Sequence, residues 1–483
     1  MTERHDERTQ PTGPEAGREA GASRPSVDLN AGVLAPVAAE VDLETDQLPV
    51  TGTLPAGLDG TLIRTGPNPF SGRFDGDSVL DWWPEAAMFH AVTIEDGKAV
   101  RYRNRWARTQ AWAQSHRPSD DAVTATELET GEPLDTNPNV HLVDHAGELL
   151  ALAEGGPPLR IDRALRTLGP TITHPALATG STAHPKVDPV TGELISFVSG
   201  WAPPYLRYLV TAADGSTTVD TTVDLPHSVM LHDLAITATR SVLFDLNVGY
   251  DLSMLADGHR IPIRWHDDRP ARIGILPRHG DHPRWFEIEP CFVQHVVNAF
   301  DAGEDGTGDR VVVDAVRYPW YFRVAGDGDG FEPDPLGVLW RWTIDLDRGT
   351  VTEGPVETGC PFDQIELPRI DESRTGRPNR HLWAVEQPST TEMRGLRHHD
   401  RTAGSTGRWV PPPGDQNSEP VFVKRPGATE EGDGWIVAAV YRAATDTTDV
   451  VLLDALDLPA GPVATIHLPV RIPAGFHGVW LPT

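Results

Sequence analysis

The sequence predicts an all-β protein of many short strands, and three observations support this. Short apolar runs alternate with period two and are bounded by Gly, Asp, Asn or Pro. No amphipathic pattern of helical period extends beyond a few turns. The chain also contains 44 prolines and 45 glycines. Prolines at this frequency disfavour a helical fold, because each one removes a backbone donor and interrupts a helix.

The predicted strands follow one another from about Val41 to the C-terminus. The clearest lie at 60–66, 147–156, 192–200, 241–249, 309–318, 338–354 and 381–387. Residues 434–458 form two buried strands joined by an ATDTTD hairpin turn, and 86–91 and 162–167 are predicted as short helical pieces. Many short strands are typical of a sandwich, barrel or propeller. At this length, sheets repeated around an axis are the most economical arrangement.

The first part of the chain differs from the rest in composition. It is rich in charge, Gly and Pro and lacks the apolar segment of a signal peptide. We therefore expect a disordered tail at 1–35 and a single propeller domain at 36–483. The two cysteines, Cys291 and Cys360, match no zinc or redox spacing, which favours a reducing cytoplasm. No apolar run reaches the length of about 18 residues that spans a membrane.

The net charge of −29 narrows the classes of partner. Nucleic-acid binding depends on neutralising phosphates with Lys and Arg, so this balance argues against it. It also disfavours adhesion to anionic lipid, although an apolar patch remains compatible with peripheral membrane contact. A highly charged soluble surface accounts for the composition most simply.

Four histidines in distinctive phrases are the candidate functional residues. They are His184 in AHPKVDP, His232 in MLHDLAI, His295 in QHVVNAFD and His477 in GFHGVW. Each lies in or beside a strand-like stretch, and a propeller axis brings distant strands together. Four neutral imidazoles at one point would suit a divalent transition metal such as Fe, Zn, Cu or Ni.

Residue chemistry alone leaves alternatives open. A single histidine among apolar residues is more often a packed core residue, and His174 and His227 lie close enough to be mistaken for ligands. Seven others lie in polar stretches that predict exposure to solvent: His5, His116, His259, His279, His282, His398 and His399.

The phrases around the four histidines resemble the carotenoid cleavage oxygenases, a family of non-haem iron enzymes. Matching phrases run in order along the chain: GTLIRTGPNPF (60–70), LLALAEGGPP (149–158), AHPKVDPVTGEL (183–194), VMLHDLAIT (229–237), EPCFVQHVVNAFDAG (289–303), IELPRI (365–370), SEPVFVKRPGATEEGDGW (418–435) and IPAGFHGVW (472–480). The resemblance implies a seven-bladed β-propeller with a cap of loops and short helices over one face.

The resemblance also implies the site. His184, His232, His295 and His477 would hold a single Fe(II) on the propeller axis, leaving positions open for dioxygen, and no separate protein acid or base is assigned. Glutamates at Glu154, Glu366 and Glu431 would orient the imidazoles, with Glu430 as an alternative to Glu431. Glu154 and Glu366 lie in apolar strand patterns, where an unpaired carboxylate would be costly.

The implied reaction is cleavage of a conjugated carbon–carbon double bond by dioxygen, giving two carbonyl products. A carotenoid or apocarotenoid is the expected substrate, and aromatic side chains would line its tunnel. Stilbene-cleaving relatives tend to carry a lysine where this chain has Ala153, which disfavours but does not remove a stilbene substrate. A catalytically silent propeller that binds a ligand is the third hypothesis. The stretch WWPEAAMFHAV (82–92) departs from the family pattern and is expected to alter the cap.

Overall fold

The structure is a computed structural model, and its described residues are 26–45, 48–116, 136–256, 259, 261–303, 308–325, 331–358 and 364–483. The predicted tail at 1–35 lies outside the described residues as far as residue 25. Within 26–35, Leu29 is buried beside Phe74 and Trp82. Cys360 also lies outside the described residues, whereas Cys291 is buried and free.

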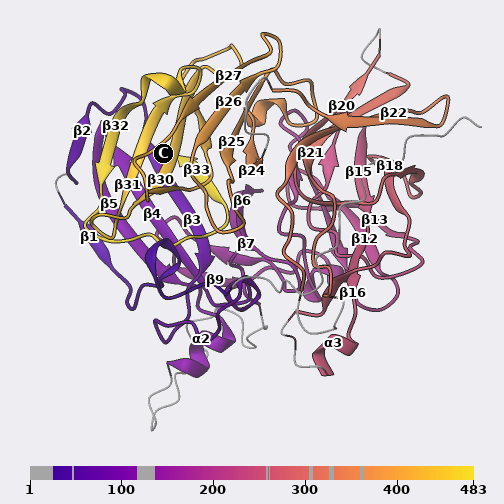
Figure 1. Cartoon of the computed structure of the whole chain (residues 1–483), viewed down its shortest axis with the longest axis horizontal. Helices are drawn as coiled ribbons and strands as arrows, with labels where there is room; N and C mark the ends of the chain where they lie inside the picture. The colour runs from indigo at the N-terminus through magenta and orange to yellow at the C-terminus, as the bar shows by residue number, and fades with distance from the viewer. Residues whose placement is uncertain are drawn as a thin grey trace, which may run out of the picture.

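The strands form a seven-bladed β-propeller, confirming the expected architecture (Figure 1). Blade 1 contains β6 (His141–His145), β7 (Glu148–Leu152), β8 (Leu159–Ile161) and β9 (Thr167–Pro170). Blade 2 contains β10 (Lys186–Val187), β11 (Leu194–Ser199), β12 (Leu206–Thr211) and β13 (Thr217–Val223). Blade 3 contains β14 (Ala235–Ile236), β15 (Arg240–Asp245), β18 (Ala271–Pro277) and β19 (Arg284–Ile288).

The next two blades repeat the same antiparallel pattern. Blade 4 contains β20 (Phe292–Ala302), β21 (Arg310–Tyr318), β22 (Val338–Asp345) and β23 (Thr350–Pro355). Blade 5 contains β24 (Ile365–Arg369), β25 (His381–Glu386), β26 (Leu396–Asp400) and β27 (Ser405–Trp409). In blades 1 to 5 the strands follow sequence order from one edge to the other, so each blade is a local meander.

The last two blades join the two ends of the chain. Blade 6 contains β28 (Gln416–Asn417), β29 (Val421–Lys424), β30 (Gly434–Arg442), β31 (Thr447–Asp454), β32 (Pro462–His467) and the early strand β2 (Val50–Gly52). Blade 7 contains the last strand, β33 (Gly478–Pro482), and the early strands β3 (Gly60–Pro67), β4 (Ala87–Glu95), β5 (Lys98–Trp106) and β1 (Asp42–Glu44). The β33–β3 and β2–β32 pairs therefore close the ring.

Apolar side chains fill the spaces between neighbouring blades. The largest buried cluster joins blades 2, 3 and 4 and includes Phe197, Phe244 and Trp342. A second cluster joins blades 6 and 7 across the closing strands, with Tyr102 and Trp435 inside it. This packing fixes the positions of the inner strands, which carry the candidate site.

Short helices and loops accompany the propeller. Among the described residues, the α-helices are α1 (Val79–Trp82), α2 (Gln110–Ser115) and α3 (Ser253–Ala256). A small hairpin of β16 (Val248–Tyr250) and β17 (Ile263–Trp265) interrupts blade 3. Figure 1 shows α2 and α3 on the same side of the molecule, at its lower edge.

The two predicted helical pieces are wrong. Residues 87–95 form β4, which pairs with β3 on one side and β5 on the other, so sheet pairing outweighs the local preference of EAAMFHA. Residues 162–166 form a turn in which the Asp162 carboxylate accepts hydrogen bonds from the backbone N–H groups of Ala164 and Arg166.

The predicted exposure of His398 and His399 is also wrong. Both lie on β26, between β25 and β27, and are 6% and 3% exposed. His398 stacks on Trp383, with ring centroids 5.5 Å apart. The polar phrase LRHHD thus belongs to the middle of a sheet, where neighbouring strands cover it.

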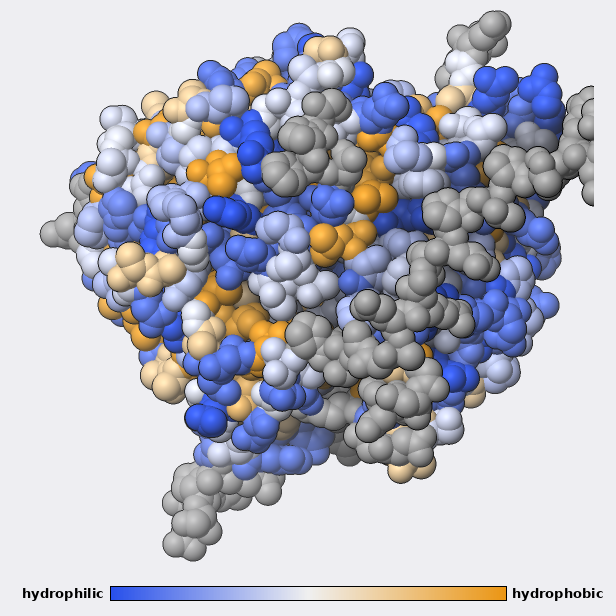
Figure 2. Space-filling model, in the orientation of Figure 1, coloured by the Kyte–Doolittle hydropathy of each residue, from blue (hydrophilic) through white to orange (hydrophobic). Residues whose placement is uncertain are grey.

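The molecular surface agrees with a composition rich in charged residues. Figure 2 shows a face on which hydrophilic side chains predominate and apolar ones are scattered. Among the described residues, none of the helices has both the length and the apolar character needed to cross a membrane.

Candidate metal centre

The four predicted histidines lie at the inner strands of four blades. His295 lies within β20 of blade 4, and His184 and His232 come shortly before β10 and β14. His477 directly precedes β33. Because the inner strands surround the propeller axis, residues distant in sequence meet there.

The imidazole rings form one compact group. The His184 ring centroid lies 4.5 Å from that of His232, 5.2 Å from that of His295 and 4.6 Å from that of His477. The His295 centroid lies 5.2 Å from that of His232 and 4.9 Å from that of His477. Nitrogen atoms of His184, His295 and His477 come within 4.8 Å of one another, as required of ligands to one ion.

The cluster is buried and contains unpartnered nitrogens. The four histidines are between 4% and 9% exposed. Within the described part of the chain, the Nε2 atoms of His184 and His232 are buried without a hydrogen-bond partner. A buried nitrogen without a partner is costly, and coordination of a metal removes that cost.

Three of the imidazoles contact a glutamate through Nδ1. The His232 Nδ1 atom lies 2.7 Å from Glu154 Oε1, and the His295 Nδ1 atom lies 2.5 Å from Glu366 Oε2. The His477 Nδ1 atom lies 2.9 Å from Glu419 Oε1. Each contact joins two blades, because the carboxylate and the imidazole come from different sheets. Nδ1 is hydrogen-bonded in His295 and His477 and faces Glu154 in His232, so Nε2 is the nitrogen that remains for a metal in each.

The expectation for Glu431 is corrected by these contacts. The Glu431 carboxylate accepts hydrogen bonds from the backbone N–H groups of Arg380 and His381, and it does not contact a histidine of the cluster. Glu430 is exposed. Glu419, in the phrase SEPVF two residues before β29, makes the histidine contact expected of Glu431, because its carboxylate lies beside His477. Its position before an apolar strand was a signal available in the sequence.

Burial and the paired charges set the protonation of the cluster. Burial would raise the pKa of Glu419, but Arg369 and His477 outweigh burial and lower it strongly. The pKa values of Glu154 and Glu366 are likewise lowered by His232 and His295, against the effect of burial. Burial lowers the pKa of His184 well below its usual value, which favours the neutral imidazole that binds metal.

Local backbone features position two of the site residues, His477 and Glu366. Gly475 approaches β3 so closely that an added Cβ would lie 2.6 Å from the Thr65 carbonyl oxygen. Directly after Gly475, the Phe476 N–H group donates to the Thr65 carbonyl and the Thr65 N–H group donates to the His477 carbonyl, which holds His477 in place. Leu367 adopts a left-handed φ of 50°, and its N–H group donates to Glu366. Such strain in a non-glycine residue is typical of functional sites.

Further residues support the glutamates and were not expected from the sequence. The Tyr318 hydroxyl donates a hydrogen bond of 2.5 Å to Glu366. The Arg369 guanidinium lies 3.4 Å from Glu419. Tyr318 is buried and Arg369 is half-buried, and each glutamate has a second contact besides its histidine.

A cavity of about 360 Å³ adjoins His295 and Glu366. Its other walls combine apolar and aromatic side chains, among them Trp82, Trp83, Tyr321, Leu336, Met393 and Phe476, with polar ones such as Gln294, Asp334 and Gln387. Both tryptophans belong to the stretch that departs from the family pattern, so this stretch lines the cavity. The volume falls within the range of small-molecule sites.

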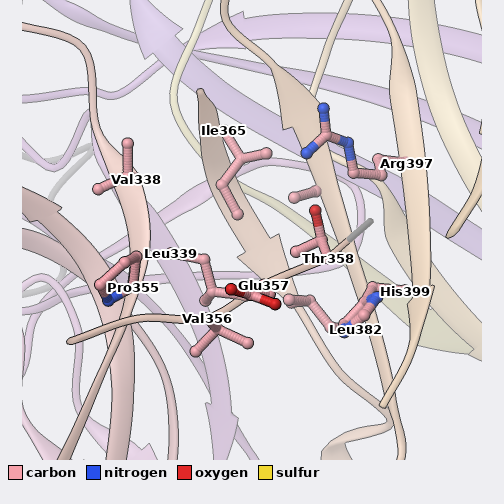
Figure 3. Close-up of a pocket in the computed structure, with 11 residues that line it drawn as sticks. Val338, Leu339, Pro355, Val356, Glu357, Thr358, Ile365, Leu382, Arg397 and His399 are labelled. Atoms are coloured by element: carbon pink, nitrogen blue, oxygen red, sulfur yellow. The ribbon is translucent and has the colours of Figure 1, made fainter. Parts of the chain in front are cut away.

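Two further cavities lie between strands of the propeller. One of about 560 Å³ follows the inner strands and is bordered by His184, His295 and His477. Another, of about 440 Å³, lies between β22 and the β25–β26 pair, where Figure 3 shows Glu357, Arg397 and His399. None of the described residues that line this last cavity belongs to the histidine cluster or its glutamates.

The two histidines that sequence could not separate from the ligands lie elsewhere. His174 forms an ion-pair contact of 3.0 Å with Asp220, and His227 lies 3.3 Å from Asp245. Both therefore have carboxylate partners outside the cluster, on β13 of blade 2 and β15 of blade 3.

Comparison with known proteins agrees with this architecture. Residues 34–482 match the family model for the retinal pigment epithelial membrane protein. The chain is 34% identical to a carotenoid cleavage oxygenase of Mycobacterium tuberculosis over 94% of this chain and 97% of that protein. It is 30% identical to a carotenoid 9,10(9',10')-cleavage dioxygenase of Crocus sativus over 93% of this chain and 88% of that protein.

A solved structure leads to the same fold. The lignostilbene dioxygenase of Pseudomonas brassicacearum superposes with a TM-score of 0.81 and 27% identity, covering 96% of this chain and all of that one. The chain therefore belongs to the retinal pigment epithelial membrane protein family, the carotenoid cleavage oxygenases that its motifs predicted.

Proposed function

We propose that His184, His232, His295 and His477 hold one Fe(II) and that the protein is a dioxygenase that cleaves a conjugated double bond. The observation that carries this proposal is the meeting of four buried imidazoles, of which two are hydrogen-bonded through Nδ1 to glutamate and a third, His232, has its Nδ1 atom 2.7 Å from Glu154. The donor set fits a divalent metal, because its free Nε2 atoms need a partner.

The metal, when bound, would supply the activation of dioxygen. The protein residues have separate tasks. Glu154, Glu366 and Glu419 fix the tautomer and orientation of three imidazoles. The apolar cavity beside His295 excludes water and holds the substrate. In the reaction, one alkene and one dioxygen give two carbonyl products, so each former alkene carbon receives one oxygen atom.

A carotenoid or apocarotenoid is the proposed substrate. The aromatic and aliphatic walls of the cavity suit an apolar polyene. Ala153, next to Glu154, is buried beside Val140 and Ala183, so this position offers no ammonium group to bind a phenol. A stilbene is the alternative, because a lignostilbene dioxygenase shares the fold.

Turnover tests the proposed reaction directly. Fe(II)-loaded protein is incubated in air with carotenoids, apocarotenals and hydroxystilbenes, and products are identified by mass. We expect aldehydes or ketones from a polyene. The His232→Ala variant should lose at least about 100-fold in rate, because one metal ligand is removed. Cleavage of stilbenes alone would transfer the assignment to the alternative. Bound iron without any product would contradict the dioxygenase and favour a silent binding propeller.

Glu419 and Glu431 provide a matched pair of variants. We expect Glu419→Gln to weaken Fe(II) binding by roughly 10- to 100-fold, because His477 loses its carboxylate partner. Glu431→Gln should leave the metal affinity near that of the unaltered protein, because Glu431 contacts only the Arg380–His381 backbone and Arg374. Competition with a chelator measures both constants. A larger loss in Glu431→Gln than in Glu419→Gln would contradict the assignment.

We also propose that the protein works in the cytoplasm and touches a membrane surface. The buried free thiol of Cys291 is compatible with a reducing compartment. Trp201, Leu252 and Leu255 expose 54%, 46% and 45% of their surface. The Trp201 ring lies 6.0 Å from that of Tyr250, two residues before Leu252, so these side chains form one patch near α3. The net charge of −29 favours a neutral rather than an anionic lipid surface.

Flotation with phosphatidylcholine vesicles tests the patch. Replacing Trp201, Leu252 and Leu255 together by Ser should reduce the bound fraction several-fold, because about 0.8 kcal/mol is lost for each methylene no longer buried in lipid. Val190→Ser serves as the control, since Val190 is 72% exposed and lies before β11, at the opposite end of that strand from Trp201. Equal flotation of the triple variant and the unaltered protein would exclude this patch as the contact.

A further inference from the structure

We propose that Asp233 is the residue that sets the relative positions of three of the four histidines, although it binds none of them. The inference rests on the proposed metal site. Asp233 lies next to His232 and is 3% exposed. Its carboxylate contacts the chain beside His184 and beside His295, so one side chain joins blades 2, 3 and 4.

The contact with blade 2 is an ion pair. The Lys186 Nζ atom lies 2.6 Å from Asp233 Oδ1. Lys186 begins β10, two residues after His184, and its side chain is 21% exposed while that of Asp233 is 2% exposed. A buried carboxylate without a cation would be unstable, so this pair fixes the distance between the His184 and His232 segments.

The contact with blade 4 acts through a β-bulge. The Val296 N–H group donates a hydrogen bond of 2.9 Å to Asp233 Oδ2. In β20 the register with β21 passes from Val293 opposite Arg317 directly to Val296 opposite Ala315, with an irregularity between the two pairs. Two residues, one of them His295, thus oppose a single residue of β21. A bulge of this kind redirects a side chain, and the Asp233 acceptor replaces the ladder bond that is lost.

The third contact orients the carboxylate itself. The Leu234 N–H group donates a hydrogen bond of 2.7 Å to Asp233 Oδ1. With both oxygens engaged, the carboxylate has little freedom to turn. Loss of the acceptor for Val296 would favour a regular β20–β21 ladder, and a slip by one residue turns a strand side chain to the opposite face. His295 would then leave the cluster.

Metal affinity measures this positioning. Metal-free full-length protein is titrated with Co(II) under chelator competition, and the visible spectrum and thermal unfolding are recorded. We expect Asp233→Asn to weaken Co(II) binding by roughly 10- to 100-fold, as for other residues that support ligands. The Co(II) spectrum should change as well, because the ligand geometry changes.

Asp314→Asn is the matched control. Asp314 is fully buried on β21 and pairs with Arg341 and Arg401, away from the histidines. The Asp314→Asn substitution should lower the thermal stability while leaving the Co(II) affinity within about twofold of that of the unaltered protein. The double variant Asp233→Asn/Lys186→Met removes both charges and guards against a folding defect from an unpaired lysine. The Co(II) affinity of the double variant should be as low as that of Asp233→Asn, because both variants lack the ion pair between residues 186 and 233.

These measurements distinguish a failure of the Asp233 proposal from a failure of the proposed metal site. If Asp233→Asn and the double variant both bind Co(II) with an affinity within about twofold of that of the unaltered protein, the proposed role of Asp233 is overturned. The proposed metal site would not be affected by that result. An equal loss of affinity in Asp314→Asn would also overturn it, because the effect would then reflect general destabilisation. Absence of Co(II) and Fe(II) binding by the unaltered protein would instead overturn the proposed function.

Discussion

Carboxylates buried beside imidazoles at the propeller axis are the constraint on which the rest of the structure depends. Glu366 and Glu419 are 3% and 1% exposed, and a buried carboxylate is tolerated only when charged or hydrogen-bonding groups surround it. Each therefore has a histidine on one side and a further partner on the other, Tyr318 or Arg369. These contacts cross from blade to blade, so the polar centre and the packing of the blades depend on each other.

Ring closure gives this centre its fourth histidine. His477 lies at the end of the chain, and β33 pairs with β3 from the beginning of the chain in the same blade. The close approach of Gly475 to Thr65 fixes the loop just before His477. The first and last parts of the chain must therefore meet before the cluster is complete. The other three histidines belong to the consecutive blades 2, 3 and 4, which share one apolar cluster.

The sequence was most informative where local pattern and fold agree. The 434–458 hairpin is β30 and β31, because uninterrupted apolar runs flanking a polar turn have few other solutions. The four histidine phrases were found by resemblance, and the structure brings all four together. The strand β4 was missed because its alanine-rich start has helical preference, which pairing with β3 and β5 overrides.

Contacts between distant segments could not be predicted in the same way. Glu419 and Glu431 lie in one motif, and only the three-dimensional path of β29 decides which carboxylate faces His477. Asp233 looks like an ordinary strand-end residue until Lys186 and Val296 are placed around it. Trp82 and Trp83 become cavity residues only because the end of α1 and the residue after it line the same cavity as His295. Each of these depends on residues far away in sequence, which periodicity does not encode.

The most direct test is a crystal structure of iron-loaded protein with anomalous diffraction recorded at the iron absorption edge. The account predicts one peak on the propeller axis, about 2.1 Å from the Nε2 atoms of His184, His232, His295 and His477. A peak away from these four nitrogens, or one bonded to a different set of residues, would contradict it.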